Sequence, residues 1–175
     1  PRYVTNFLQA CEEYADEVDY DQGLVWHKGG LTQVKSYPIS VDYEGIKEMA
    51  VSPEVKEREN LIRKIKGENF LIYRTDRADL SKNIIRGFKA YDLFLEKYPE
   101  YHGKVKFLTT GKPTRQQIDE YNEYYLRTKE IVDEVNTKHG RDGWKPIEWI
   151  FKADYSLVVA AFKNYDCLIV NPIAD

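Results

Sequence analysis

The pattern of hydrophobic and polar positions divides the chain into an N-terminal part and a longer remainder. Residues 4–15 carry apolar side chains at helical spacing, which predicts an amphipathic helix with one buried stripe. Residues 24–27 and 31–37 flank Gly29-Gly30, a pattern typical of a β-hairpin. The first 42 residues are therefore predicted to hold one helix and an antiparallel pair of strands.

Two helices are predicted next. Asp42 is placed to cap a short helix that ends near Ala50. Ser52-Pro53-Glu54 has the composition of a helix start, because Ser is a favoured N-cap and Pro is favoured in the first turn. Gly67 is a suitable end for this second helix.

Strand and helix patterns then alternate as far as the last residues. The predicted strands cover residues 69–75, 105–110, 147–151 and 167–170, and the predicted helices cover residues 83–98, 116–139 and 156–163. This alternation is typical of parallel βαβ units with right-handed crossovers, so the expected fold is α/β, with a Rossmann-like parallel sheet and helices on both faces. The last strand is apolar throughout, which predicts that both of its faces are covered.

Ligands of such sheets bind beyond the carboxyl ends of the strands. The loops expected to form a site are therefore residues 76–82, 111–115 and 152–155, together with the residues from 171 onward.

Composition narrows the class of protein. Of the 175 residues, 42% are hydrophobic and 31% charged, as in a globular protein, and the net charge of -3 argues against a general nucleic-acid binder. No apolar run approaches the ~20 residues of a membrane span. Cys11 and Cys167 form no CxxC pair, so we expect both to be reduced in a cytoplasmic protein. The chain starts at Pro1 and ends directly after a strand pattern, and we expect sequence to be missing on both sides.

One charged segment is the first candidate site. Residues 77–83, Arg-Ala-Asp-Leu-Ser-Lys-Asn, follow the first parallel strand and open a helix. A helix N-terminus offers free amide donors and a partial positive charge, and an arginine side chain matches phosphate bidentately. Arg77 and Lys82 would add two cations. The alternative is a solvated charged loop in which Ser81 caps the helix.

Other motifs do not support a different chemistry. Gly111-Lys112-Pro113-Thr114 is similar to the end of a P-loop but lacks its first glycine, and Pro113 stands where a magnesium-binding hydroxyl is needed. Asp19-Tyr20-Asp21 lies outside the predicted parallel sheet and is interpreted as a polar loop. The three histidines lack the spacing of zinc ligands, so no metal site is predicted.

The ordered set of motifs resembles a known family. Arg-x-Asp-x-Ser-Lys after a strand is similar to the signature of retaining glycosyltransferases of the trehalose-6-phosphate synthase type. The resemblance covers nearly the whole chain, in order, through Asn6-Phe7-Leu8, residues 37–42, 95–99 and 102–104, Pro113-Thr114-Arg115 with Tyr121, residues 143–147 and residues 171–175. It implies a two-domain GT-B enzyme, of which residues 1–42 are the tail of the acceptor-side domain and the crossover, and residues 43–175 the nucleotide-sugar-binding domain, truncated at its C-terminus.

The resemblance also implies roles for particular residues. Arg77 and Lys82 would hold the diphosphate of the donor and stabilise its charge. Lys163 and Asp175 would bind the donor nucleotide sugar, although a solvated lysine in the last helical turn explains Lys163 equally well. Arg115 would bind the phosphate of the acceptor, against the simpler interpretation of an arginine in water at a helix start.

The reaction that the resemblance implies is transfer of a sugar, with retained configuration, from a nucleotide sugar (UDP-glucose by default) to a sugar- or polyol-phosphate acceptor. It implies no metal or other cofactor, no nucleic acid and no membrane, and leaves a homo-oligomer open. The chain departs from the family by having Asn83 where glycine is usual, in which it is more similar to the relatives that make glucosylglycerol phosphate or validoxylamine 7'-phosphate.

The upstream histidine and Gly-rich loop of the family lie outside this sequence, so we expect the piece alone to be inactive. A non-catalytic regulatory or scaffolding domain that keeps the fold is the alternative. A complete flavodoxin-like domain is disfavoured by the N-terminal helix and hairpin.

Overall fold

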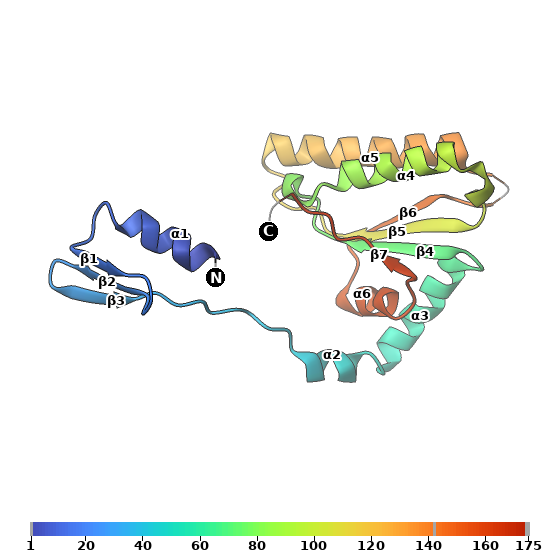
Figure 1. Cartoon of the computed structure of the whole chain (residues 1–175). Coiled ribbons are helices and arrows are strands. Elements are labelled where there is room, and N and C mark those ends of the chain that lie inside the picture. The colour runs from blue at the N-terminus through green and yellow to red at the C-terminus, as the bar shows by residue number, and fades with distance from the viewer. Residues whose placement is uncertain (1, 142, 174–175) are drawn as a thin grey trace. The chain divides into compact units, whose positions relative to one another are not determined.

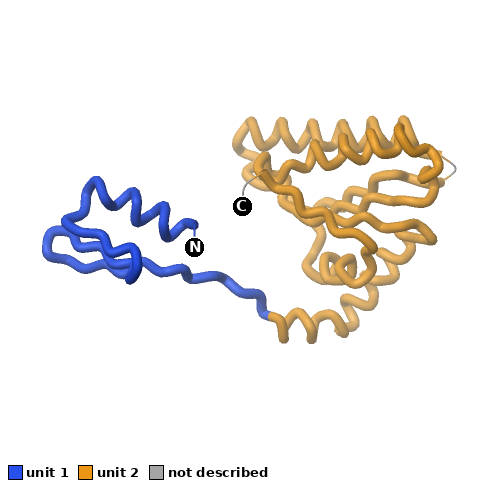
Figure 2. Tube along the Cα trace, in the orientation of Figure 1, with its two compact units in different colours: residues 1–42 blue, residues 43–175 orange. Residues whose placement is uncertain are grey.

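The computed structural model describes residues 2–141 and 143–173. The chain divides into two compact units, residues 1–42 and residues 43–175 (Figure 2).

The first unit is a helix followed by a small antiparallel sheet (Figure 1). It contains α1 (Arg2–Cys11) and the strands β1 (Glu17–Asp19), β2 (Leu24–His27) and β3 (Gly30–Gln33), in the order β1-β2-β3. The helix and the hairpin were predicted, whereas the three-residue β1 was too short to show a pattern. Asp19 ends β1, and its carboxylate accepts the N–H groups of Asp21 and Gln22 at 2.9 Å each, so this acidic pair forms a local turn.

The second unit is a parallel sheet with helices on both faces. The strand order is β6-β5-β4-β7, with β4 (Phe70–Thr75), β5 (Val105–Gly111), β6 (Ile147–Phe151) and β7 (Cys167–Leu168). Figure 1 shows α4 (Ile84–Lys97) and α5 (Asp119–His139) over one face, with α3 (Pro53–Lys66) and α6 (Tyr155–Phe162) over the other. The remaining elements are α2 (Tyr43–Met49) and the short 3₁₀ turns η1 (Leu80–Lys82) and η2 (Pro99–Tyr101).

Each face of the sheet has its own hydrophobic core. Leu71, Tyr73 and Leu108 pack toward α3 and α6, whereas Phe107 and Ile147 pack toward α4 and α5. Because successive strand side chains point to opposite faces, both cores draw on the same strands. The apolar runs that predicted the strands follow from burial on both sides.

Helix ends follow the predicted capping chemistry in part. The Ser52 hydroxyl accepts the N–H of Val55 at 3.3 Å at the start of α3, and Gly67 ends the helix with a φ of 54°. Asp154 caps α6, with its carboxylate 2.7 Å from the N–H of Leu157. The α5 helix begins at Asp119 rather than at residue 116, because the preceding loop continues to Ile118.

The last strand differs most from its prediction. β7 has only two residues, and both side chains are exposed. It pairs with β4 at one edge of the sheet, so the prediction of a strand covered on both faces is wrong within the described residues. Apolar composition alone did not separate an edge strand from a central one. Across the described residues, no helix is long and apolar enough to cross a membrane.

Candidate functional site

The carboxyl ends of β4 and β5 remain paired beyond the sheet. The N–H of Asp76 donates to the carbonyl of Thr110 at 3.1 Å, and the N–H of Ala78 donates to the carbonyl of Lys112 at 3.0 Å. Gly111 lies against the Asp76 carbonyl so closely that a Cβ at position 111 would overlap it. The loops after these two strands therefore leave the sheet as a joined pair.

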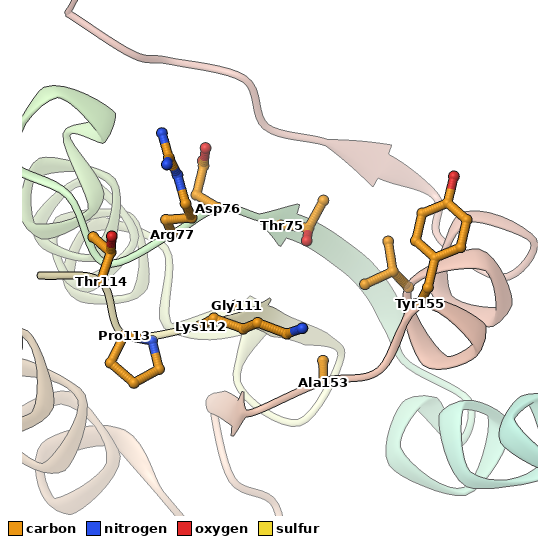
Figure 3. Close-up of a pocket in the computed structure, with 10 residues that line it drawn as sticks. Thr75, Asp76, Arg77, Gly111, Lys112, Pro113, Thr114, Ala153 and Tyr155 are labelled. Carbon is orange, nitrogen blue, oxygen red and sulfur yellow. The ribbon is translucent and has the colours of Figure 1, made fainter. Parts of the chain in front are cut away.

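A pocket of about 470 Å³ opens at this edge (Figure 3). Its walls come from the ends of β4 and β5 and from the start of α6. The lining residues are Thr75, Asp76, Arg77, Gly111, Lys112, Pro113, Thr114, Ala153, Tyr155 and Val158. Its position beyond the carboxyl ends of the strands is the one predicted for a ligand site.

The segment from Arg77 to Lys82 is folded around one buried carboxylate. Asp79 is 9% exposed, and one of its oxygens accepts both the N–H and the hydroxyl of Ser81 at 2.9 Å. These hydrogen bonds, followed by the charges of Arg77 and Arg115, lower the pKa of Asp79 although burial opposes the shift. Ser81 is thus a partner of Asp79 in η1. The alternative interpretation, in which Ser81 caps α4, is therefore wrong.

The amides at the start of α4 already have a partner. The hydroxyl of Tyr124, on α5, accepts the N–H of Ile84 at 2.8 Å and that of Ile85 at 3.4 Å. Asn83 holds the N-cap position with a φ of 57° and makes no side-chain capping bond. The prediction that these first amides are free to bind phosphate is therefore wrong for Ile84 and Ile85, and Tyr124 was not singled out in the sequence.

Arg115 lies beyond β5 with its guanidinium held by an aromatic ring. Its Nη1 donates to the hydroxyl of Tyr121 at 2.7 Å, and the guanidinium carbon is 5.3 Å from the centre of that ring. The backbone of Arg115 has a φ of 50°, which few residues other than glycine, Asn or Asp adopt readily. The backbone bridge between Ala78 and Pro113 holds the loop of Arg115 beside the Arg77 segment.

One of the predicted residues, Lys163, is not brought to this group. Lys163 follows the C-terminal end of α6, where its ammonium donates to the carbonyl of Ala50 at 2.6 Å and lies 3.1 Å from the Glu59 carboxylate. The α6 helix starts at the pocket and runs back toward the beginning of β7, so its last turn lies away from Arg77. Asp175 lies outside the described residues. Lys82 lies at the end of η1. Among the predicted donor residues that the structure describes, only Arg77 lines the pocket.

The accessible charge around the pocket is positive. Asp76 forms an ion pair with Arg74 at 2.8 Å, Asp79 is bound by Ser81, and Asp154 pairs with Arg58 at 2.6 Å. In contrast, the side chains of Arg77, Lys112 and Arg115 are exposed. An anion is the ligand that this arrangement favours.

Sequence reasoning assigned no role to two residues of the loops that it expected to form the site. Lys112, in residues 111–115, lines the pocket, and its charge contributes to lowering the pKa of Asp154 after the backbone bond to Leu157 and the contact with Arg58. Tyr155 opens α6 and lines the opposite wall (Figure 3). Both residues lie in segments that follow strand ends, and that position was the available signal. No group of three or more potential metal ligands occurs in residues 2–141 or 143–173.

The sequence comparisons agree with the fold and with the motifs. The sequence profile of glycosyltransferase family 20 matches residues 1–175. The UDP-forming α,α-trehalose-phosphate synthase B of Dictyostelium discoideum is 33% identical over 99% of this chain. The UDP-forming α,α-trehalose-phosphate synthase of Schizosaccharomyces pombe is 30% identical over 97%. The chain belongs to glycosyltransferase family 20. It spans 23% and 33% of the length of these two relatives.

Solved structures show the same architecture. The E. coli trehalose-6-phosphate enzyme bound with UDP-2-fluoro glucose superposes with a TM-score of 0.84 at 25% identity, over 97% of this chain and 38% of that one. A Burkholderia xenovorans α,α-trehalose-phosphate synthase in complex with glucose-6-phosphate gives 0.79 at 26% identity, over 87% and 34% of the two chains. The predicted fold class, the parallel-sheet part of a GT-B glycosyltransferase, is confirmed.

Proposed function

We propose that the full-length protein transfers a glucosyl group, with retained configuration, from a nucleotide diphosphate sugar to a sugar- or polyol-phosphate acceptor. The observation that carries this proposal is the cationic pocket at the carboxyl ends of β4 and β5. Arg77 and Lys112 line it, while the three nearby carboxylates are held by Arg74, Ser81 and Arg58. A diphosphate bound there would meet a net positive charge, because Arg74 and Arg58 offset the charges of Asp76 and Asp154.

The donor fits this pocket in two parts. Arg77, with Lys82 at the end of the same folded segment, would bind the diphosphate, and the apolar surface of Pro113, Ala153 and Val158 would contact the nucleobase. Negative charge grows on the diphosphate as the glycosidic bond breaks. Cations that bind it more strongly in the transition state than in the ground state accelerate the reaction. The fixed cations would thereby perform the role that a metal has in other folds, so the reaction is proposed to need none.

UDP-glucose is the proposed donor, because the similar E. coli structure holds a UDP-sugar analogue. The proposed acceptor is a sugar phosphate, because a second similar structure is described with glucose-6-phosphate. Arg115 would bind the acceptor phosphate, with Tyr121 setting the direction of its guanidinium. Polyol phosphate stays within the proposed acceptor class, since Asn83 departs from the glycine of the trehalose-phosphate pattern.

A calorimetric titration of the full-length protein with UDP-glucose and with GDP-glucose, beside Lys82→Ala, tests the donor site. Binding of one nucleotide sugar that weakens in the variant would support both donor and site. Absence of binding to either, in a folded protein, would contradict the glycosyltransferase proposal.

A non-catalytic role is the second candidate. The N-terminal domain of a Candida albicans trehalose-6-phosphate phosphatase shares the fold, with a TM-score of 0.78 at 23% identity. The same architecture therefore occurs in a protein named for a different reaction. Turnover of UDP-glucose by the full-length protein with a sugar-phosphate acceptor would exclude this candidate.

A further inference from the structure

Arg74 is a fully buried arginine beneath the loop that carries Arg77 and Lys82. It lies on β4 with a relative exposure of 0%. Charged side chains are almost never buried unless they are paired, since moving a charge out of water costs several kcal/mol. The groups that bind the guanidinium therefore indicate its structural role.

The guanidinium joins three separate segments of the chain. It pairs with the carboxylate of Asp76 at 2.8 Å, and its Nη1 donates to the Oδ1 of Asn171 at 2.6 Å. Its Nη2 donates to the backbone carbonyl of Lys82. One side chain thus connects the end of β4, the turn that holds Lys82 and the chain that follows β7.

Two further hydrogen bonds join the same segments. The Nδ2 of Asn83 donates to the carbonyl of Asn171 at 3.1 Å, and the N–H of Ile173 donates to the carbonyl of Ser81 at 2.8 Å. Asn83 makes its bond from a left-handed backbone conformation, which Asn tolerates better than most residues. Residues 81–83 and residues 171–173 are therefore bound both to Arg74 and to one another.

The packing leaves the arginine little freedom. Gly87 of α4 faces it, and a Cβ at that position would lie 3.1 Å from Nη1. The helix thus approaches the guanidinium closely because it has no side chain there. An ammonium group could not replace the planar group, since lysine is a point charge without the fixed pair of donors.

We propose that Arg74 is a positioning residue that fixes the turn of Lys82 and residues 171–173 as a single unit before any ligand binds. The inference rests on the proposed function in so far as Lys82 binds the donor diphosphate. Arg74 does not line the pocket and acts through the backbone of Lys82. A backbone turn that is held in place in advance lowers the ordering cost of binding, and that cost is otherwise subtracted from affinity.

Hydrogen–deuterium exchange of the full-length protein without ligand tests the structural link. Arg74→Gln is compared with wild type and with Tyr91→Phe, which loses a buried hydroxyl bond to the carbonyl of Val105. In Arg74→Gln, the amides of residues 81–83 and the amide of Ile173, which donates to the Ser81 carbonyl, should all exchange at least about tenfold faster. This is expected when a local opening is made easier by the loss of charged hydrogen bonds. In Tyr91→Phe they should be unchanged. Faster exchange in only one of the two segments, or in neither, overturns the proposal.

Titration of the same variants with UDP-glucose tests the consequence for binding. Arg74→Gln should weaken binding by about tenfold, and Arg74→Lys, which keeps the charge, should not restore it. Unchanged affinity in Arg74→Gln contradicts the positioning role. If wild type binds neither UDP-glucose nor GDP-glucose, the proposed function fails. The exchange result then still tests whether Arg74 joins residues 81–83 to residues 171–173.

A second pair of variants applies if Arg74→Gln does not fold. Asn83→Gly keeps the left-handed backbone but removes the bond to Asn171, and Asn171→Ala removes the acceptor of Nη1. Both should speed exchange in residues 171–173 and also in residues 81–83. Protection that stays intact in residues 81–83 of Asn171→Ala refutes the single unit.

Discussion

Gly111 and Asp76 make backbone contact at the point where β5 and β4 leave the sheet, and no side chain at position 111 would fit between them. We expect Gly111→Ala to separate the two loops and to destabilise the fold by about 1–3 kcal/mol, the usual cost of overpacking. Chemical denaturation of the full-length protein measures this change. Gly30→Ala, whose nearest contact would be an ordinary 3.4 Å, serves as the control and should be near neutral.

Lys82→Ala should lower nucleotide-sugar affinity by about ten- to a hundredfold, because hydrogen bonds to charged groups contribute roughly 1.5–3 kcal/mol. It should also lower turnover, since the charge on the leaving group grows in the transition state. The matched control is Lys89→Ala, an exposed lysine in the second turn of α4, beyond the Arg77–Lys82 segment. Unchanged binding and turnover in Lys82→Ala would remove Lys82 from the donor site.

Arg115→Ala should raise the KM for the sugar-phosphate acceptor and leave the donor Kd unchanged. Tyr121→Phe removes the hydroxyl that receives the Arg115 Nη1 bond, and we expect a smaller rise of about threefold to tenfold in the same constant. Initial-rate kinetics with both substrates varied separate these effects. A loss of donor affinity as large as the acceptor effect would contradict the assigned role.

The family resemblance and the observed geometry assign different roles to Lys163. Its ammonium binds the carbonyl of Ala50 and the carboxylate of Glu59. Burial alone would raise the pKa of Glu59, and the bonds from Lys163 and Asn164 lower it instead. Lys163→Ala should therefore cost roughly 0.5–1.5 kcal/mol of unfolding free energy and leave the donor Kd unchanged. A tenfold weaker donor Kd at unchanged stability would favour the donor-site role instead.

The site should lose its structure in acid. The pKa of Asp79 is lowered by its backbone bond from Ser81, and the pKa of Asp154 by its backbone bond from Leu157. Both carboxyls bind protons less readily in the folded than in the unfolded chain, where the ordinary value is about 3.9. Their stabilisation is therefore fully present above that value and is lost as the pH falls through the lower folded pKa values.

Thermal unfolding between pH 7 and pH 3 measures this effect. Wild type should show a nearly constant Tm down to about pH 5 and a decline below about pH 4. Asp79→Asn should have a lower Tm at pH 7 and a shallower decline. An equally steep decline in the variant would show that Asp79 does not contribute.

The sequence predicted the parallel sheet because strand and helix patterns alternate from residue 69 onward, and it placed Arg77 correctly after a strand end. It did not predict Arg74 as a central group, because a charged residue within a strand pattern gives no signal of the partners that bury it. Tyr124 and Asn171 lie 40 and 88 residues from their partners Ile84 and Asn83, so local patterns could not join them. The exposure of β7 depends on its position at the edge of the sheet, and hydrophobic periodicity does not predict the order of the strands.

The Arg74 network also restricts how this chain can change in evolution. Replacing Asp76 or Asn171 alone would leave a buried positive charge with fewer partners, and replacing Arg74 alone would release the Lys82 carbonyl and the Asn171 side chain together. A larger residue at Gly87 would press on the guanidinium. Residues 74, 76, 83, 87 and 171 therefore depend on one another, and we expect them to change together when related proteins replace the structure beneath the turn of Lys82.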